Sequence, residues 1–375
     1  MKLSVLQENF TYGLTTTSRS VAAKAQLPVL SNILLATDQG RLKLSATNLE
    51  TGINLWLGAK IERQGAISIP AKILTEYVSS LPAEKIDLEI KENLLYLTCG
   101  SYKASFIGLP AGEFPNIPSL KGKPEVSLLT KDLSLAISQV AFAAAQDEGR
   151  PVLTGVLIQT KGENLILVAT DGYRLSLKKL AGLREIQKVV EFQKGLLIPA
   201  RTLVEVGKII SVGDEEKTLG LTITPEENQV IFTTPDCEIV SRLIEGKFPE
   251  FEKILPQKGT TRVILDAQGL AMAARVAAIF ARESANIIRF EVGDSKLKVS
   301  ANAAQVGDNV SEVEAKIEGK GGKIAFNSRY LLDFLNSANS DLINFEMTTS
   351  LNPGVFTPAG DKSYLHVIMP VRVQE

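Results

Sequence analysis

Residues 151–158 read Pro-Val-Leu-Thr-Gly-Val-Leu-Ile, and residues 28–35 read Pro-Val-Leu-Ser-Asn-Ile-Leu-Leu. A fainter copy, Ala-Asn-Ile-Ile-Arg-Phe, occupies residues 285–290. We expect each copy to form a strand that is preceded by an amphipathic helix and followed by a hairpin. The spacing of the copies far exceeds the roughly 20–50 residues of solenoid repeats, so the repeat predicts three similar domains.

The start of a second helix repeats with the same period. Pro70, Pro199 and Asn327 each precede an amphipathic stretch, and they lie 129 and 128 residues apart, close to a third of the 375-residue chain. Proline and small polar residues at such positions are typical of helix N-termini. The period therefore assigns two helices to each domain.

Two stretches between the repeats have the composition of linkers. Residues 119–125 and 256–261 combine proline, glycine and lysine between apolar runs. They place the expected domains at residues 1–120, 126–256 and 260–375. Domains of this size can each bury a core of their own.

Apolar periodicity predicts the elements within each domain. Residues 165–169 and 296–300 alternate between the two faces of half-buried antiparallel strands. Two helices with many short strands predict an α+β fold in which helices pack on one side of antiparallel sheets. Each expected helix has an apolar face with residues three or four apart. These faces contain Phe10, Leu14 and Val21; Ile73, Leu74, Tyr77 and Val78; Leu133, Ile137, Val140 and Ala144; Leu203, Val206 and Ile210; Leu270, Ala274, Ala277 and Ala281; and Leu331, Leu332 and Leu335.

The chain lacks the side chains that most catalytic sites need. Its one histidine is His366, and its two cysteines, Cys99 and Cys237, are 138 residues apart with no companion at metal-ligand spacing. Zinc needs three or four such ligands, and no Gly-Lys pair is followed by the Ser or Thr of a phosphate loop. We therefore expect a binding or structural protein without a cofactor or metal. An enzyme that uses His366 is the weakest alternative.

Bulk properties describe an ordinary globular protein. Hydrophobic residues make up 45% and charged residues 22%, and the net charge is −1. This charge argues against a protein that covers nucleic acid with a generally basic surface, but it neither demands nor excludes a DNA partner. The first residues do not form a signal peptide, and no window of 18 apolar residues exists, so we expect a cytoplasmic protein.

Residues 168–175, Val-Ala-Thr-Asp-Gly-Tyr-Arg-Leu, predict a strand, a two-residue Asp-Gly turn and a second strand, as in many plain hairpins. This segment closely resembles the matching hairpin of the bacterial DNA polymerase III β subunits, the replicative sliding clamps. The resemblance extends in order along essentially the whole chain. It includes residues 27–32, 151–155, 246–250, 330–335 and 364–372.

The resemblance implies a DNA clamp fold in which two three-domain subunits join head to tail as a homodimer. The resulting ring of six domains encircles double-stranded DNA without sequence specificity, so weak phosphate contacts suffice and permit sliding. The family member is a non-catalytic processivity factor that tethers the replicative DNA polymerase. It also binds the clamp loader and repair proteins through short peptide motifs. The alternative is a peptide-binding adaptor that does not encircle DNA.

The candidate DNA contacts are basic residues on or beside the six helices. Lys24 and Lys72 align with family positions that touch DNA, and lysine suits sequence-blind phosphate contact as a point charge. The same helices also carry acids such as Glu76 and Glu205, so a solvated helix face is the competing interpretation for each candidate. The candidates are Arg19, Lys24, Lys72, Arg150, Arg201, Lys208, Arg275, Arg282 and Arg329.

The resemblance also implies an apolar peptide groove between the second and third domains. Methionine and aliphatic side chains make such a pocket adaptable, and Arg174 and Arg372 can frame it. Tyr173 stands where many relatives have His and Val371 where they often have Met, and we expect these differences to narrow the range of accepted peptides. The matching positions are Thr170, Gly172, Tyr173, Arg174, Leu175, Pro249, Ile254, Tyr330, Val367, Met369, Pro370, Val371 and Arg372.

Two segments match the subunit contact of the family. Lys103, Ala104, Ser105 and Phe106 are expected on an exposed edge strand, whose unpaired backbone favours sheet extension across subunits. Ile279 and Phe280 match the apolar contact of the third domain. Their competing interpretation is the ordinary core of the fifth helix.

Overall fold

The computed structural model describes residues 1–22, 27–120, 122–147, 149–181, 189–211, 218–224, 228–255, 259–305 and 307–372. The chain forms two compact units. One consists of Met1–Lys131 with Lys208–Leu243, and the other of Asp132–Gly207 with Ile244–Glu375. The central third of the chain contributes to both units, because its strands pair with the first third in one unit and with the last third in the other.

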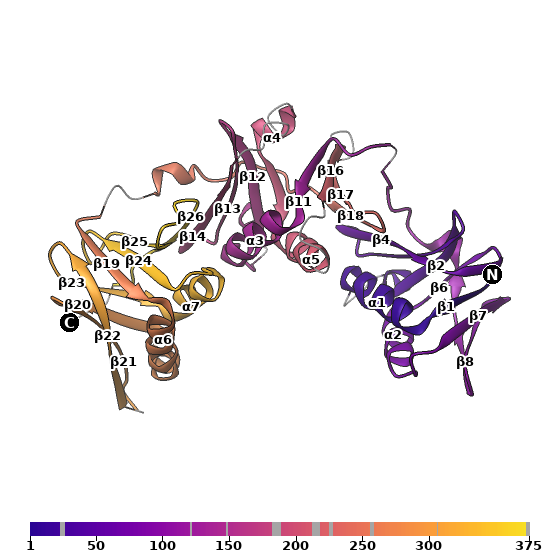
Figure 1. The fold of residues 1–375 in the computed structure, drawn as a ribbon, viewed down its shortest axis with the longest axis horizontal. Helices are drawn as coiled ribbons and strands as arrows, with labels where there is room; N and C mark the ends of the chain where they lie inside the picture. Colours follow the sequence, from indigo (N-terminus) through magenta and orange to yellow (C-terminus); the bar gives the residue numbers. More distant parts are fainter. Residues whose placement is uncertain are drawn as a thin grey trace. The chain divides into compact units, whose positions relative to one another are not determined.

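The first unit contains two antiparallel sheets (Figure 1). The five-stranded sheet has the order β5 (Lys60–Arg63), β1 (Lys2–Leu6), β7 (Lys85–Lys91), β8 (Leu94–Cys99) and β9 (Tyr102–Ile107). The nine-stranded sheet has the order β10 (Leu109–Pro110), β6 (Ala66–Pro70), β2 (Asn32–Asp38), β3 (Arg41–Thr47), β4 (Thr51–Gly58), β18 (Cys237–Arg242), β17 (Gln229–Thr233), β16 (Thr218–Thr224) and β11 (Val126–Leu129). We refer to the pairing of β4 with β18 as the first seam.

Helices α1 (Gln7–Thr17) and α2 (Ala71–Ser79) lie side by side against these sheets (Figure 1). The fully buried Phe10 and Leu14 form the inward face of α1, as the apolar spacing predicts. Gly13 lies between them, where a Cβ atom would come within 2.6 Å of the Leu44 side chain. This glycine therefore allows α1 to approach β3 closely.

The second unit contains one antiparallel sheet of twelve strands. Its order is β15 (Leu196–Pro199), β12 (Gly155–Lys161), β13 (Asn164–Thr170), β14 (Arg174–Leu180), β26 (Tyr364–Ile368), β25 (Gly354–Pro358), β24 (Leu342–Met347), β19 (Thr261–Asp266), β22 (Gly307–Glu318), β21 (Lys296–Ala303), β20 (Ile287–Val292) and β23 (Gly322–Asn327). We refer to the pairing of β14 with β26 as the second seam.

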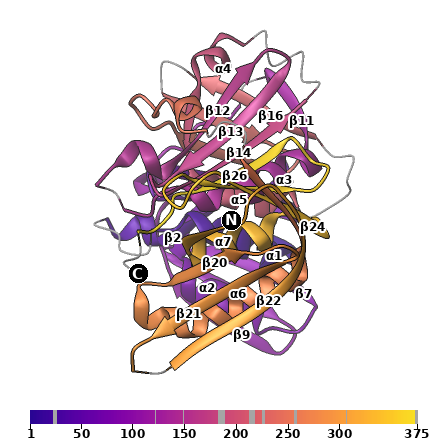
Figure 2. The same cartoon turned by 90° about the vertical axis from the view of Figure 1, so that its left-hand side faces the viewer.

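Helices α6 (Ala267–Ala281) and α7 (Ser328–Ser337) pack together beneath this sheet, and strands β21 and β22 contact α6 (Figure 2). Both helices begin at side-chain caps. Asp266 accepts a hydrogen bond from the Gly269 amide, and Asn327 accepts one from the Arg329 amide. The remaining α-helices of the described segments are α3 (Thr130–Val140), α4 (Val190–Lys194) and α5 (Ala200–Ile210).

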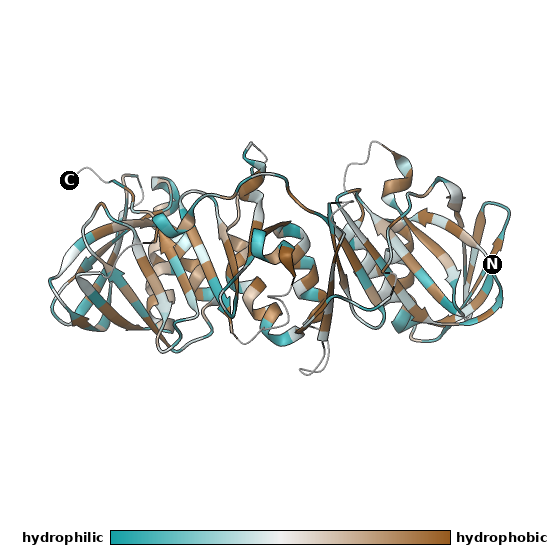
Figure 3. Cartoon of the chain, turned by 90° about the horizontal axis from the view of Figure 1, so that it is seen from above, coloured by the Kyte–Doolittle hydropathy of each residue, from teal (hydrophilic) through white to brown (hydrophobic). Residues whose placement is uncertain are grey.

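Aromatic rings fill the core between α6, α7 and the sheet. Phe290, Phe326 and Phe345 meet edge to face, with centroids 5.6 to 5.9 Å apart, which is the favoured arrangement of paired rings. Phe356 stacks on Phe345 at 4.8 Å. Bands of apolar and polar residues alternate along many strands (Figure 3), as expected for sheets with one buried face.

Four local expectations are wrong. The repeated segments begin as 3₁₀ helices at Pro28–Ser31 and Pro151–Thr154, and strands follow only from Asn32 and Gly155. Proline fixes a φ that suits a 3₁₀ start as well as a strand. Val21 and Ala144 lie beyond the ends of the helices expected to contain them, α1 and α3 (Thr130–Val140), and α4 is an additional short helix.

The fourth concerns the Asp171-Gly172 hairpin. Its ladder ends with Thr170 opposite Leu175, so four residues rather than two form the loop.

Candidate functional site

The loop between β13 and β14 is closed by side chains that bind its own backbone. Thr170 Oγ1 donates to the Arg174 carbonyl at 2.6 Å and accepts from the Gly172 amide at 3.0 Å. Asp171 Oδ1 accepts from the Tyr173 and Arg174 amides. Gly172 has a φ of 92°, which glycine adopts without strain. This loop presents the Tyr173 side chain to solvent with 60% of its surface exposed.

Arg174 is the most heavily bonded residue of the candidate site, and only 9% of its surface is exposed. Its guanidinium donates to Asp171 Oδ2 at 3.1 Å, to Asp333 Oδ2 at 2.5 Å and to the Phe142 carbonyl at 2.7 Å. Its Cζ atom lies 4.5 Å from the ring centroid of Tyr330 and 5.3 Å from that of Phe142. Arg174 is therefore a structural tie between β14 and α7.

Tyr330 forms the outer cover of this guanidinium. The side chain is half-buried, and this burial is the main reason that the pKa of its phenol is raised. The negative charge of Asp171 raises the pKa further. The phenol therefore stays protonated at neutral pH and can donate a hydrogen bond.

The chain after β26 completes the site. The Met369 amide donates to the Tyr173 carbonyl at 2.8 Å, and the Val371 amide donates to the Ala325 carbonyl at 2.8 Å. Leu175 and Val367 are buried in one apolar cluster with Phe248 and Phe251, while 39% of the Met369 surface is exposed. The structure thus places Leu175 opposite Val367 on two paired strands, with Tyr173 and Met369 together just beyond the ends of those strands.

The other predicted peptide contacts are arranged around this pair of strands. Pro249 and Arg372 are exposed, Pro370 and Val371 are half-buried, and Ile254 is 40% exposed after a short 3₁₀ turn. Pro249 also lines a separate cavity of about 430 Å³, together with Leu157, Gln159, Lys194, Gly195, Leu197 and residues 246–252. None of the other predicted peptide contacts lines that cavity.

His366 lies below the exposed surface, in β26. Its side chain is fully buried and its Nδ1 atom is hydrogen-bonded to Ser176 Oγ at 2.6 Å. Burial, followed by the positive charge of Arg174, lowers the pKa of the imidazole to about 3. A histidine without access to solvent, held neutral, does not suit general acid-base work at neutral pH.

Sequence reasoning did not find Phe142, Asp171 or Asp333, all of which bind Arg174. Asp171 lies in the quoted hairpin, so its bond to a backbone amide two residues later was a detectable local signal. Phe142 and Asp333 are 32 and 159 residues away from Arg174, and no local pattern connects them to it.

The basic candidates that the structure describes are all exposed. Lys72 lies on α2 and Arg329 on α7. Arg201 and Lys208 are seven residues apart on α5, and Arg275 and Arg282 have the same spacing along α6 and the turn after it, so each pair shares a helix face. Arg150 lies beside the hairpin, where it donates to the Asp171 carbonyl at 3.2 Å. Arg19 lies in a 3₁₀ turn after α1, and Lys24 lies outside the described residues.

The predicted subunit contacts occupy two places. Strand β9, with Lys103, Ala104, Ser105 and Phe106, stands at one end of the five-stranded sheet. The Phe106 ring points inward and packs edge to face on Tyr77 at 5.5 Å. On α6, 59% of the Ile279 surface is exposed, whereas Phe280 packs partly against the aromatic core.

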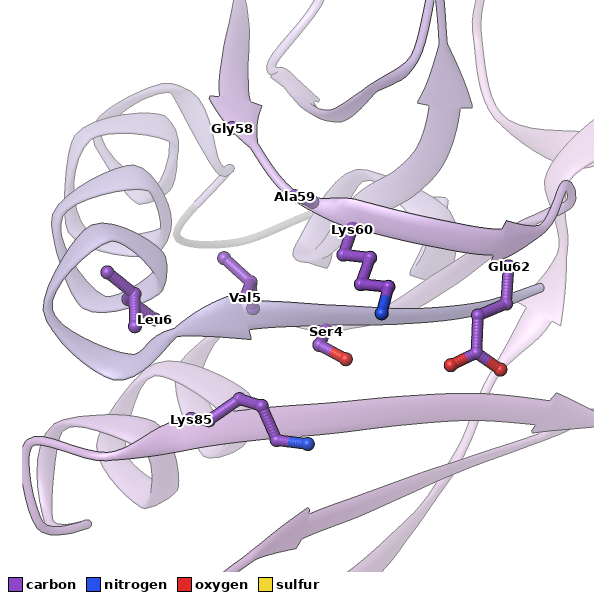
Figure 4. Close-up of a pocket in the computed structure, with 8 residues that line it drawn as sticks. All are labelled: Ser4, Val5, Leu6, Gly58, Ala59, Lys60, Glu62 and Lys85. Carbon is purple, nitrogen blue, oxygen red and sulfur yellow. The ribbon is translucent and has the colours of Figure 1, made fainter.

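A further cavity of about 450 Å³ lies on the first unit, between β1, β5 and β7 (Figure 4). Its charged groups are mostly paired: Lys85 lies 3.0 Å from Asp87, and Glu62 lies 2.6 Å from Lys2. None of the predicted site residues lines it. The lining residues are Ser4, Val5, Leu6, Gly58, Ala59, Lys60, Glu62 and Lys85.

Within the described ranges, no group of three or more His, Cys, Asp or Glu residues is placed to hold a metal ion. Burial raises the pKa of the Cys237 thiol to about 12, so this cysteine is not a nucleophile. No helix in the part of the chain that the structure describes is long and apolar enough to cross a membrane.

The fold is that of the DNA clamps. The chain matches over its full length the DNA polymerase III β subunit of Thermotoga maritima, with a TM-score of 0.90 and 26% identity. It matches equally fully a Pseudomonas aeruginosa sliding clamp that was solved bound to griselimycin, with a TM-score of 0.89 and 28% identity. In both comparisons the match covers 100% of this chain and 100% of the other chain.

Sequence comparison agrees. Family models of the DNA polymerase III β subunit match residues 1–118 with the N-terminal domain, 127–250 with the central domain and 252–372 with the C-terminal domain. The beta sliding clamp of Synechococcus elongatus is 30% identical over 100% of both chains, and that of Staphylococcus aureus is 28% identical over 99% of both.

The chain therefore belongs to the DNA polymerase III β subunit family. It is a DNA sliding clamp, a non-catalytic subunit that works in DNA replication. These comparisons favour the clamp over the adaptor and the His366 enzyme.

Proposed function

We propose that two copies of this chain close head to tail into a ring of six domains around double-stranded DNA. The observation that supports it is β9, which ends the five-stranded sheet and has no strand paired to its outer edge among the residues that the structure describes. Such an edge favours pairing with another chain. The exposed Ile279 on α6 supplies an apolar contact of the kind found in homodimer interfaces.

The exposed basic residues on the helices support sequence-blind DNA contact. Paired positions on one helix face, such as Arg201 with Lys208, let successive turns reach a phosphate backbone. The proposed DNA contacts are Arg19, Lys24, Lys72, Arg150, Arg201, Lys208, Arg275, Arg282 and Arg329. The three domains 1–120, 126–256 and 260–375, and the cytoplasm as the location, belong to the same proposal.

Retention on DNA tests the ring. The dimer should have a mass in solution of about twice 40.5 kDa. Once loaded, it should stay on nicked circular DNA and be lost when that DNA is linearised, because only a topological link depends on closure. Equal retention on both substrates, or a stable monomer at high concentration, contradicts the ring.

We further propose that the surface around Tyr173 and Met369 binds short peptides of the replicative polymerase, the clamp loader and repair proteins. Exposed Tyr173 and Met369 over the buried Leu175 and Val367 make an adaptable apolar surface. The griselimycin complex of the Pseudomonas aeruginosa clamp provides a probe.

Griselimycin affinity tests this site. We expect Tyr173→Ala and Met369→Ala each to weaken binding about tenfold, the effect of truncating an anchor residue. The matched control is Leu49→Ala, because Leu49 is an equally exposed apolar residue on the corresponding hairpin of the first seam. The control should bind griselimycin as the unmodified chain does. An equal loss in all three variants contradicts the proposed site.

A further inference from the structure

Ser176 and His366 form a buried polar pair in the middle of the second seam. They face each other across β14 and β26, and neither side chain has any exposed surface. Their hydrogen bond is 2.6 Å long. Ser176 follows Arg174 by two positions, and His366 precedes Met369 by three. Arg174 and Met369 both belong to the candidate peptide site. The pair thus lies directly behind that site.

The imidazole also belongs to a series of groups in contact, each packed against the next, which we call the column: Tyr330, Arg174, Phe142, His366 and Phe334. His366 stacks on Phe334, with centroids 5.4 Å apart and ring planes 14° apart, and its other neighbour, Phe142, is 5.5 Å away. Phe142 then packs against the Arg174 guanidinium, which Tyr330 covers. The column therefore connects the buried histidine to two residues of the candidate site.

The first seam provides an internal comparison. Counted from the two hairpins, Ser176 and His366 occupy the same register as Ile53 and Ile239, which face each other across β4 and β18. Those isoleucines are as deeply buried and purely apolar. A sheet seam of this geometry therefore forms without a polar pair, and burying polar groups is not needed to hold the strands together.

We propose that His366 is a positioning residue of the peptide site, holding Arg174 and Tyr330 in their binding geometry through the column. This inference rests on the proposed peptide binding. A planar ring suits the role, because the imidazole stacks on Phe334 and packs against Phe142 at a tilt of 44°. The Ser176 hydroxyl satisfies one nitrogen of this buried ring.

Two variants at His366 distinguish the contribution of the ring itself from the contribution of its polar atoms. His366→Ala removes the ring and opens the column between Phe142 and Phe334. The double variant Ser176→Ala with His366→Phe keeps a ring and removes both polar groups. We expect the first to weaken griselimycin binding about tenfold, through lost preorganisation. We expect the double variant to bind within about threefold of the unmodified chain.

The control is Ile239→Ala, which removes a buried side chain at the same register of the first seam. It should lower stability as His366→Ala does but leave griselimycin affinity unchanged. If both alanine variants lose affinity equally, the effect is general destabilisation and the inference is wrong. It is also wrong if His366→Ala binds griselimycin like the unmodified chain. Should His366→Ala not fold, His366→Leu provides the same test.

A spectroscopic readout reports on Arg174 without any ligand. The Nε proton of Arg174 is held by Asp171, so its NMR signal should exchange slowly in the unmodified chain and in the double variant. In His366→Ala the signal should shift and exchange faster, and in Ile239→Ala it should not change. If griselimycin fails to bind the unmodified chain, the peptide proposal fails, while an unchanged Arg174 signal in His366→Ala independently overturns the positioning role.

Discussion

The hairpins at the first and second seams are closed by the same hydrogen bonds. Thr47 and Thr170 each donate to the carbonyl four residues later, at 3.1 and 2.6 Å, and accept from the amide two residues later. Asn48 and Asp171 each accept from the amides two and three residues later. In both hairpins the neighbouring strand then donates one amide to the loop. The two hairpins of this chain thus share a backbone frame, by which we mean the same set of hydrogen bonds at matching positions.

The side chains on this frame differ. The second hairpin carries Arg174 and its partners, whereas Thr51 occupies the matching position of the first. At the first seam Ile117, from the segment after β10, lies against Gly52, where a Cβ atom would come within 2.8 Å of it. The comparison teaches that the shared backbone hydrogen bonds are enough to form a seam. A few side chains then determine whether the hairpin at that seam also forms an adaptable binding surface.

Arg174→Ala should produce the largest difference between the seams. It removes a nearly buried guanidinium and leaves Asp171 and Asp333 without their partner, so we expect the free energy of unfolding to fall by about 3 kcal/mol. Thr51→Ala at the first seam should cost about 1 kcal/mol. Urea unfolding measures both, and equal losses contradict the assignment of Arg174 as a tie.

Acid should weaken only the second seam through its histidine. The pKa of His366 is lowered to about 3 in the folded chain, below its ordinary value near 6.5. Its stabilising contribution is therefore complete above pH 6.5 and is lost as the pH falls toward 3. The loss is about 1.4 kcal/mol per pH unit, or about 2 kcal/mol at pH 5.

Because His366 is the only histidine, the variant Ser176→Ala with His366→Phe should abolish this dependence between pH 6.5 and 5. Urea unfolding at a series of pH values measures it. A double variant that keeps the slope shows that another group is responsible.

The two hairpin threonines give a matched pair with a smaller effect. Thr47→Val and Thr170→Val each remove a hydroxyl that makes two hydrogen bonds, so each should lower the free energy of unfolding by about 1 kcal/mol. Only Thr170→Val should weaken griselimycin binding, because only that loop carries Tyr173. A comparable affinity loss in Thr47→Val would argue against the division of roles between the seams.

The smallest effect concerns the left-handed residue of each hairpin. Leu49 has a φ of 75° and Gly172 one of 92°. Leu49→Gly should relieve strain and raise the free energy of unfolding by about 0.5 kcal/mol. Gly172→Ala should lower it by about 1 kcal/mol, because a Cβ atom there would lie 3.2 Å from Arg150 Nη1. Thermal unfolding of the two variants should shift in opposite directions.

The sequence predicts elements well where the signal is local. The helices after Pro70, Pro199 and Asn327 start where their periodicity and N-terminal residues indicate. It fails at Pro28 and Pro151, because the φ of proline is compatible with both a 3₁₀ turn and a strand. Residue-level matching to a family supplied the site candidates that periodicity alone does not.

Long-range features could not be predicted in this way. Ser176 meets His366 across 190 residues, and neither residue carries a local sign of the other. Their pairing depends on the register of two strands, which the whole sheet determines. The same holds for the burial of Arg174, because its partners Phe142 and Asp333 come from other elements.

At the first seam, the first third of the chain is held to the central third by more than the peptide that connects them. Strand β18 holds β4 by a backbone ladder, and Glu238 on β18 binds the Ser119 hydroxyl at 2.6 Å and the Leu120 amide at 3.3 Å. The peptide bonds between β10 and β11 are thus only one of several attachments of the first third. We therefore expect a polypeptide nicked between β10 and β11 to keep its two fragments associated, so that the gene could be divided there into two halves that reassemble as a split protein.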